Sequence, residues 1–247
     1  MTLALAGLGA LAAAYVQAAT GLGFALVLTP VMLALLSPAA AIVTVTALGL
    51  ELNLLVLVGE RRRPRVAWRD LGPILAAAAP GTVCGVILLR ALSKPVLQLA
   101  VGVALIIAAG ALLRARAGAP GRAGGSLRAR LAVGFTTGAL TTATGVSGPP
   151  LALWFARRRL APAEVRDSLS ATFLAIGVIG FAALVPVMSR AHLSAPLLAA
   201  GIACVIGGHA VGRRAFARLD PRRFQPLMLG IIACAGAASI VAGAAGL

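Results

Sequence analysis

The sequence predicts an all-α, polytopic transmembrane helical bundle of two inverted repeats, each a broken helical hairpin followed by three spans. Three observations favour this fold. The 247 residues are 60% hydrophobic and 11% charged, with a mean hydropathy of +1.01, which is more apolar surface than a soluble domain can bury. Two apolar stretches are interrupted by Gly, Thr and Pro, and arginine-rich connections separate the longer apolar runs.

The basic balance fits a membrane protein better than a nucleic-acid-binding one. Lys and Arg number 22 against 6 acidic residues, giving a net charge of +16. The arginines lie in short connections between apolar runs, which is the positive-inside pattern of membrane proteins. Aromatic residues make up 4% of the chain, so stacking on bases has little support. We therefore expect the lipid bilayer, and no nucleic acid, as a partner.

The first repeat, residues 1–114, begins with two short apolar pieces. Residues 3–17 would form about 22 Å of helix, less than the ~30 Å bilayer core. Thr20-Gly21-Leu22-Gly23 interrupts the apolar sequence, and Ser37-Pro38 makes a turn after the second piece. The expected elements in order are the broken pair 3–17 and 24–36, then spans at 39–58, 71–89 and 96–113.

The second repeat, residues 131–247, follows a Gly- and Arg-rich cytoplasmic linker at 115–130 and has the same order of elements. Its expected elements are the broken pair 131–140 and 151–156, then spans at 169–188, 193–211 and 224–245. Ala143-Thr144-Gly145 repeats Ala19-Thr20-Gly21 after 124 residues. At nearly the same spacing we align Pro73 with Pro196 and Gly85 with Gly208.

Arginine placement predicts the orientation. The connections at 61–69, 114–130, 157–166 and 213–223 are arginine-rich and should be cytoplasmic, whereas the turns at 37–41, 90–95 and 189–192 should face outward. Each half then crosses three times if its broken pair enters and leaves on one side. The halves are therefore inverted, which permits alternating access. If the short helices of a pair both cross fully, they add two crossings and leave the later loops on the same sides. Re-entrant and crossing pairs therefore both remain open.

The second break is the most distinctive stretch. Residues 140–154 combine four hydroxyl side chains with Pro149-Pro150, and prolines are favoured in the first turn of a helix. The free N–H groups of Val146, Ser147 and Gly148 should then face the break. Two broken segments at corresponding positions indicate a transporter's binding site. The predicted substrate-binding residues are Gln17, Thr20, Gly21, Gly23, Thr141, Thr144, Gly145, Val146, Ser147 and Gly148. The alternative is close helix packing by Gly and Thr.

With these motifs, the chain resembles the TauE/SafE family of sulfite exporters and sulfonate permeases. The resemblance rests on Thr20-Gly21-Leu22-Gly23-Phe24 with Pro30, Ser37-Pro38-Ala39-Ala40-Ala41, Gly134, Gly138 and Thr144-Gly145-Val146-Ser147-Gly148-Pro149-Pro150. It implies transport of sulfite, sulfoacetate, toluenesulfonate or another small sulfur-containing anion. Helix N-termini suit such a compact anionic head group, and hydroxyls can rotate to donate to it.

Several further side chains carry weaker predictions. Glu51 lies inside an apolar run and could couple transport to protons; alternatively it snorkels to the basic loop or pairs with an arginine. His209 is interpreted as a packed histidine, and Gly81/Gly85 and Gly208/Gly212 as close-packing faces. We expect the remaining hydroxyls of the spans mainly to bond their own helices: Thr29, Thr44, Thr46, Ser168, Ser170 and Thr172.

Together these features predict a secondary transporter of a small sulfur-containing anion in the bacterial cytoplasmic (inner) membrane, with about eight to ten membrane segments. No P-loop is present in the sequence, so ATP should not drive transport within this chain. We expect no cofactor, no metal and no enzymatic activity. Alternatives are a carrier of another small organic anion and a non-transporting structural subunit. A homodimer is compatible with the sequence, and the direction of transport and the coupling ion stay open.

Overall fold

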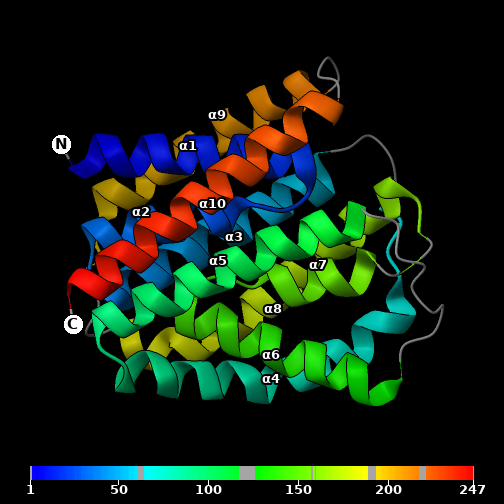
Figure 1. Cartoon of the computed structure of the whole chain (residues 1–247), viewed down its shortest axis with the longest axis horizontal. Coiled ribbons are helices and arrows are strands. Elements are labelled where there is room, and N and C mark those ends of the chain that lie inside the picture. The colour runs from blue at the N-terminus through cyan, green and yellow to red at the C-terminus, as the bar shows by residue number, and fades with distance from the viewer. Residues whose placement is uncertain are drawn as a thin grey trace.

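The computed structural model describes residues 2–59, 64–116, 126–156, 158, 160–188, 193–216 and 221–246. Over these ranges the chain forms α-helices joined by short connections, with no strand (Figure 1). The helices are α1 Thr2–Thr20, α2 Phe24–Leu35, α3 Pro38–Val58, α4 Trp68–Ala91, α5 Lys94–Arg116, α6 Leu127–Thr144, α7 Gly148–Ala156, α8 Pro162–Met188, α9 Ala195–Phe216 and α10 Pro221–Ala245. The predicted all-α class and order of elements are confirmed.

Four helices in the described part of the chain are long and apolar enough to cross a membrane. They are Pro38–Val58, Trp68–Ala91, Glu164–Met188 and Ala195–Arg214, and they belong to α3, α4, α8 and α9. The third predicted span of each half is also helical, as α5 over Lys94–Arg116 and α10 over Pro221–Ala245. The molecule is therefore a multi-pass membrane protein.

The short helices form two hairpins. A Cβ added to Gly9 in α1 would lie 3.0 Å from Val31 Cγ1 and 3.6 Å from Leu28 Cδ1 in α2, so α2 folds back along α1. α7 likewise packs on α6. α2 has 12 residues and α7 has 9, about 18 and 14 Å of helix. Since the bilayer core is ~30 Å thick, neither α2 nor α7 is long enough to cross it.

Glycines bring two pairs of helices into backbone contact. A Cβ on Gly81 or Gly85 of α4 would collide with the carbonyl oxygen of Phe135 or Ala139 in α6. Likewise, a Cβ on Gly208 of α9 would collide with the Leu11 carbonyl oxygen in α1. Small residues let membrane helices approach this closely. The prediction that these glycines form close-packing faces is confirmed.

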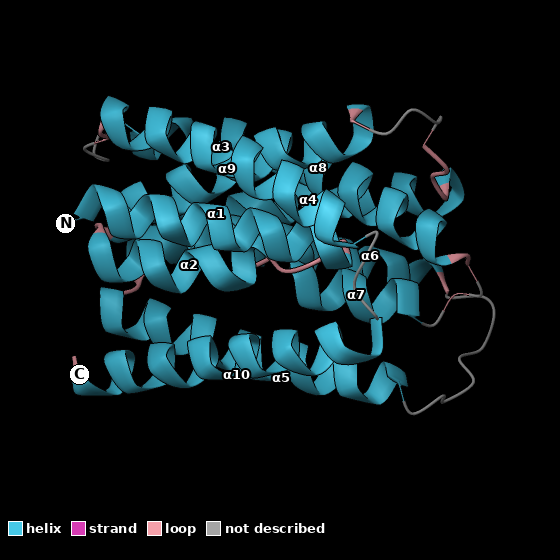
Figure 2. Ribbon diagram, turned by 90° about the horizontal axis from the view of Figure 1, so that it is seen from above, coloured by secondary structure: helices cyan, strands magenta, loops and turns pink. Residues whose placement is uncertain are grey.

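The remaining helices form two antiparallel pairs. α10 packs along α5, where a Cβ on Gly102 would lie 2.5 Å from Ile240 Cγ1 and one on Gly243 would lie 2.7 Å from Leu99 Cγ. Figure 2 shows α5 and α10 side by side in one layer, beneath the hairpins. α3 packs on α8, where Leu50 Cδ2 lies 2.8 Å from the Cβ position of Gly177. These helices surround the hairpin tips.

Candidate functional site

The first break lies between α1 and α2, where the predicted Thr20–Gly23 interruption falls. Gly21 and Gly23 have φ angles of 75° and 132°, a region that glycine enters readily because it lacks a Cβ. A Cβ on Gly21 would lie 3.0 Å from Arg166 Cγ. The end of α8 that carries Arg166 therefore packs against the first break. The Thr20 side chain lies outside the described side chains.

The second break lies between α6 and α7. Gly145 ends α6 in the left-handed conformation, with φ of 73° and its N–H donating to the Thr141 carbonyl at 3.1 Å, which is a common way for a helix to end. Gly148 begins α7, so Pro149 and Pro150 occupy its first turn. The position predicted from the two prolines is confirmed.

The two breaks meet. A Cβ on Gly148 would lie 3.0 Å from Leu22 Cδ1 in the first break. A Cβ on Gly145 would lie 3.0 Å from Thr29 Oγ1 in α2 and 3.4 Å from Ile42 Cδ1 in α3. Segments about 124 residues apart in the sequence are thus in side-chain contact. Their polar groups can act on one ligand.

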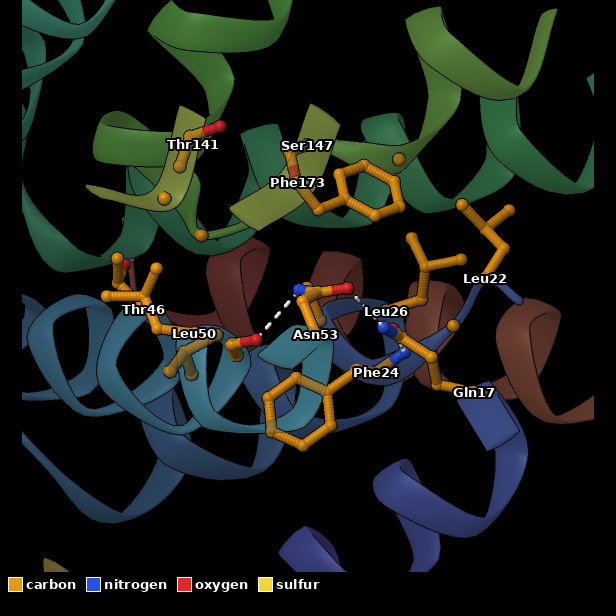
Figure 3. A pocket seen from close by; sticks show the side chains of 17 residues that line it. Gln17, Leu22, Phe24, Leu26, Thr46, Leu50, Asn53, Thr141, Ser147 and Phe173 are labelled. Atoms are coloured by element: carbon orange, nitrogen blue, oxygen red, sulfur yellow. Dashed lines mark hydrogen bonds between the residues drawn. The ribbon is translucent and has the colours of Figure 1, made fainter. Parts of the chain in front are cut away.

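A cavity of about 50 Å³ opens where the breaks meet (Figure 3). That volume holds roughly three to five water molecules at ~10–15 Å³ each. Its walls come from both breaks, α3 and α8, and the lining residues are Gln17, Leu22, Gly23, Phe24, Ala25, Leu26, Val45, Thr46, Gly49, Leu50, Asn53, Thr141, Gly145, Ser147, Gly148, Phe173 and Gly177. Among the described residues, this lining combines amide and hydroxyl groups with apolar side chains and contains no charged side chain.

The cavity brings together six of the ten residues predicted to bind substrate: Gln17, Gly23, Thr141, Gly145, Ser147 and Gly148. Gly21, Thr144 and Val146 lie within the breaks but are not in the lining. Phe24, Phe173 and Asn53 line the cavity and were not among the predicted binding residues. A polar side chain inside an apolar run was the sequence signal that could have pointed to Asn53.

Two hydroxyls at the second break donate to their own helix, whereas Thr142 Oγ1 donates to the Thr82 carbonyl in α4 at 2.7 Å. Thr141 Oγ1 donates to the Thr137 carbonyl at 2.7 Å, and Thr144 Oγ1 donates to the Leu140 carbonyl at 2.8 Å. Thr144 Oγ1 also accepts the Val146 N–H at 3.3 Å. The expectation that the Val146 N–H is free is therefore wrong, because a nearby threonine oxygen satisfies it. Ser147 also lines the cavity, and its hydroxyl makes no such bond among the described residues.

The hydroxyls of the spans include some that bond their own helix and some that do not. Thr46 and Thr172 donate to the carbonyls four residues earlier, Ile42 at 2.7 Å and Ser168 at 2.6 Å, as predicted. The Ser168 hydroxyl instead accepts the Ala67 N–H at 3.0 Å. Thr29 and Ser170 have buried hydroxyl oxygens without a hydrogen-bond partner among the described residues. Of these hydroxyl residues, only Thr46 lines the cavity.

At the first break, two side-chain amides form a buried bridge. The Phe24 N–H, the first of α2, donates to Gln17 Oε1 at 3.1 Å, and Gln17 Nε2 donates to Asn53 Oδ1 at 3.0 Å. Asn53 Nδ2 donates to the Gly49 carbonyl at 2.7 Å. Figure 3 shows the two amides pointing toward one another beside the cavity. This bridge ties the first hairpin to α3.

Glu51 lies outside the cavity lining. Both of its carboxylate oxygens are buried and have no hydrogen-bond partner among the described residues. The predicted alternative, pairing with an arginine of the basic loop, concerns residues 60–63, which lie outside the described ranges. His209 is buried, as expected of a packed histidine.

An ion-pair cluster ties α4 to the second hairpin. Asp70, buried at the start of α4, lies 2.6 Å from Arg158 Nη2 and 3.3 Å from Arg130 Nε. The Arg158 guanidinium also stands 4.6 Å from the ring centroid of Trp154, a cation–π contact. The sequence showed these arginines only as parts of basic loops, because their acidic partner is remote in the chain.

The fold and the cavity define the class of protein: a multi-pass membrane transporter. Residues 5–239 match the family described as sulfite exporter TauE/SafE, and the chain belongs to that family. It is 32% identical over 180 residues to the probable sulfite/organosulfonate exporter TauE of Cupriavidus necator, covering 70% of this chain and 69% of that protein. No solved structure matches the chain.

Proposed function

We propose that this protein is a secondary transporter in the bacterial cytoplasmic membrane that moves a small sulfur-containing anion by alternating access. The observation that carries the proposal is the meeting of two helix breaks, one from each half, at an uncharged cavity lined by amide and hydroxyl groups. The family membership and the name of the Cupriavidus necator relative support sulfite or an organosulfonate as the substrate.

The contacts of the breaks support an inverted repeat. A shift of 124 residues takes Gly21 to Gly145 and Ile42 to Arg166. In the structure Gly21 packs on Arg166, and Gly145 packs on Ile42. Swapping the two halves therefore reproduces this pair of contacts. α3 with α8, and α5 with α10, are antiparallel pairs of corresponding helices, as a two-fold axis in the membrane plane requires.

The close-packing glycines support the same symmetry in a different register. The 124-residue shift takes Leu11 to Phe135, and these residues contact Gly208 and Gly81 respectively. Gly208 therefore corresponds to Gly81, a shift of 127 residues, whereas the sequence alignment paired it with Gly85. The sequence alignment is therefore displaced by one helical turn in α4, because single glycines are easily mismatched in Ala- and Leu-rich sequence.

The chemistry of the cavity suits a compact anion. Uncharged donors and the positive ends of α2 and α7 can stabilise a head group with three oxygens. Binding without a fixed cation in the lining is weak enough to permit release, which a carrier needs. The volume of about 50 Å³ fits a head group of four or five heavy atoms better than an aromatic sulfonate in this conformation.

We further propose that Glu51 couples this transport to protons. A carboxyl group buried in a membrane span is costly and is retained mainly for function. Its two oxygens have no hydrogen-bond partner among the described residues. No hydrogen-bond donor of these residues therefore opposes protonation of the carboxylate.

Flux into proteoliposomes tests the proposed function. Radiolabelled sulfite, held under anaerobic conditions, should enter vesicles containing the protein with saturable kinetics, and methanesulfonate should compete while acetate should not. Equal competition by acetate would favour a general organic-anion carrier. Flux no faster than in protein-free vesicles would favour a structural subunit and contradict the proposal.

A further inference from the structure

The amide bridge has only one orientation that satisfies all of its hydrogen bonds. One end is the Phe24 N–H, which can only donate, and it donates to Gln17 Oε1. Gln17 must then offer its nitrogen to Asn53, which accepts through Oδ1. The other end is the Gly49 carbonyl, which can only accept, and it accepts from Asn53 Nδ2. Turning either amide over would set donor against donor or acceptor against acceptor.

This fixed orientation decides what the bridge offers to a ligand. Both side-chain carbonyl oxygens are engaged within the bridge, whereas each amide nitrogen carries a second N–H that the bridge does not use. Gln17 and Asn53 are only 4% and 6% exposed, and both line the cavity. Buried polar groups favour a ligand that can hydrogen-bond to them. The bridge therefore favours a ligand that accepts hydrogen bonds.

We propose that Gln17 and Asn53 form the specificity-determining pair of this cavity, selecting an acceptor-only anion over a neutral ligand of the same shape. The inference rests on the proposed function and adds a role for Asn53, which contacts the ligand through its second N–H. Gln17 has two tasks, since it also caps α2. Selection then depends on bridge polarity as well as on cavity size.

Two ligands of nearly equal shape test this selection: methanesulfonate, whose three sulfonyl oxygens only accept, and methanesulfonamide, in which an NH₂ donor replaces one oxygen. Calorimetric titration of the purified full chain should show that methanesulfonate binds more tightly by about tenfold to a hundredfold, the range that one or two hydrogen bonds to a charged group contribute. Equal affinity for the two ligands would overturn the inference.

Two variants reverse the polarity of the bridge. Asn53→Asp replaces the donor nitrogen with a carboxylate oxygen. Gln17→Glu keeps an oxygen to accept the Phe24 N–H, and the α2 N-terminus favours its charge, so this variant should fold even if Asn53→Asp does not. Each should lose about tenfold or more in the preference for methanesulfonate. Gln98→Glu in α5 makes the same chemical change outside the cavity lining and should keep the wild-type preference.

The outcomes separate the two proposals. Wild-type protein that neither binds nor transports any sulfonate or sulfite would end the proposed function. If the wild-type protein transports sulfite, the proposed function stands whatever the variants do. Variants that keep the wild-type preference, or that lose affinity for both ligands equally, would show that the bridge has only a structural role and would overturn the inference.

Discussion

The two breaks line the same cavity but are held by different contacts. They share one local bond, from the Gly21 N–H to the Gln17 carbonyl at 2.7 Å and from the Gly145 N–H to the Thr141 carbonyl at 3.1 Å. At the first break the Gln17 side chain also reaches Asn53, 36 residues away, whereas at the second the Val146 N–H bonds to Thr144, two residues away. A locally bonded break keeps its shape while its neighbours move, whereas a break bonded to other helices follows them. The first hairpin is thus the better candidate for the element that moves.

The bases of the two hairpins also differ, because only the second is held by an ion pair of this kind. Asp70 holds Arg130 and Arg158 at the start of α6 and just beyond α7. The 124-residue shift places Ala6 and Ala34 at the corresponding positions of the first hairpin. No ion pair of this kind can form there. The second hairpin is anchored by charge, and the first depends on its amide bridge and apolar packing.

The largest expected effect comes from Gly145→Ala. An L residue in the left-handed conformation costs about 1–2 kcal/mol, and the new Cβ would meet Thr29 Oγ1 at 3.0 Å. Because a small misplacement of a binding group can cost up to ~10²-fold, flux in proteoliposomes should fall by at least about tenfold. Gly21→Ala should lower flux by a similar factor, since Gly21 also has a left-handed φ of 75° and its new Cβ would meet Arg166 Cγ at 3.0 Å and Cβ at 3.3 Å.

The matched control for these variants is Gly207→Ala in α9, where a Cβ would meet nothing within 4 Å. It should transport at the wild-type rate. Wild-type flux in Gly145→Ala or in Gly21→Ala would contradict the role given to the breaks.

Asp70→Asn should loosen the second hairpin. The change keeps the shape of the side chain but leaves Arg130 and Arg158 without their carboxylate, and a hydrogen bond to a charged group contributes about 1.5–3 kcal/mol. The melting temperature should fall, and hydrogen exchange should increase in α7 more than in α2. Glu164→Gln, an acid-to-amide change at the start of α8, is the control; increased exchange in α2 alone would contradict the assignment.

Thr144→Val should weaken the second break more modestly. Valine has the same shape but removes the oxygen that accepts the Val146 N–H, and an unsatisfied buried donor costs about 1–3 kcal/mol. Flux should fall several-fold while the protein stays folded. Thr136→Val removes an equivalent hydroxyl that bonds only its own helix and should have little effect; equal flux in both variants would show that the Val146 bond is dispensable.

Glu51→Gln should have the smallest effect on binding and a specific effect on coupling. The amide fills the same space but cannot release a proton, so sulfite flux should no longer respond to an imposed pH gradient. Glu164→Gln should keep that response. An unchanged pH response in Glu51→Gln would return Glu51 to a structural role.

Sequence reasoning located what local chemistry determines. The glycines and prolines placed the helix ends at both breaks to within four residues, because left-handed glycines and first-turn prolines are properties of a few adjacent residues. The start of α8 was placed at residue 169 instead of Pro162 because Arg166 and Asp167 interrupt the apolar run. Asp167 is in fact buried and accepts the Arg65 N–H at 2.8 Å.

The groups that sequence reasoning missed have partners far along the chain. Asn53 was not predicted, because nothing nearby in the sequence reveals Gln17 as its partner. Asp70 likewise gains its meaning from Arg130 and Arg158, 60 and 88 residues later in the chain. Both are products of the tertiary arrangement, which a local pattern does not encode.

The most direct measurement of the central claim is a disulfide between the two breaks. Leu22→Cys and Gly148→Cys, combined in a chain whose three native cysteines are replaced, put thiols at the contact between Leu22 and Gly148. Oxidation should form the cross-link and arrest flux of radiolabelled methanesulfonate, which does not cleave disulfides, and reduction should restore the flux. Failure to cross-link, or undiminished flux through the cross-linked protein, would contradict an account in which the breaks meet and move at the substrate cavity.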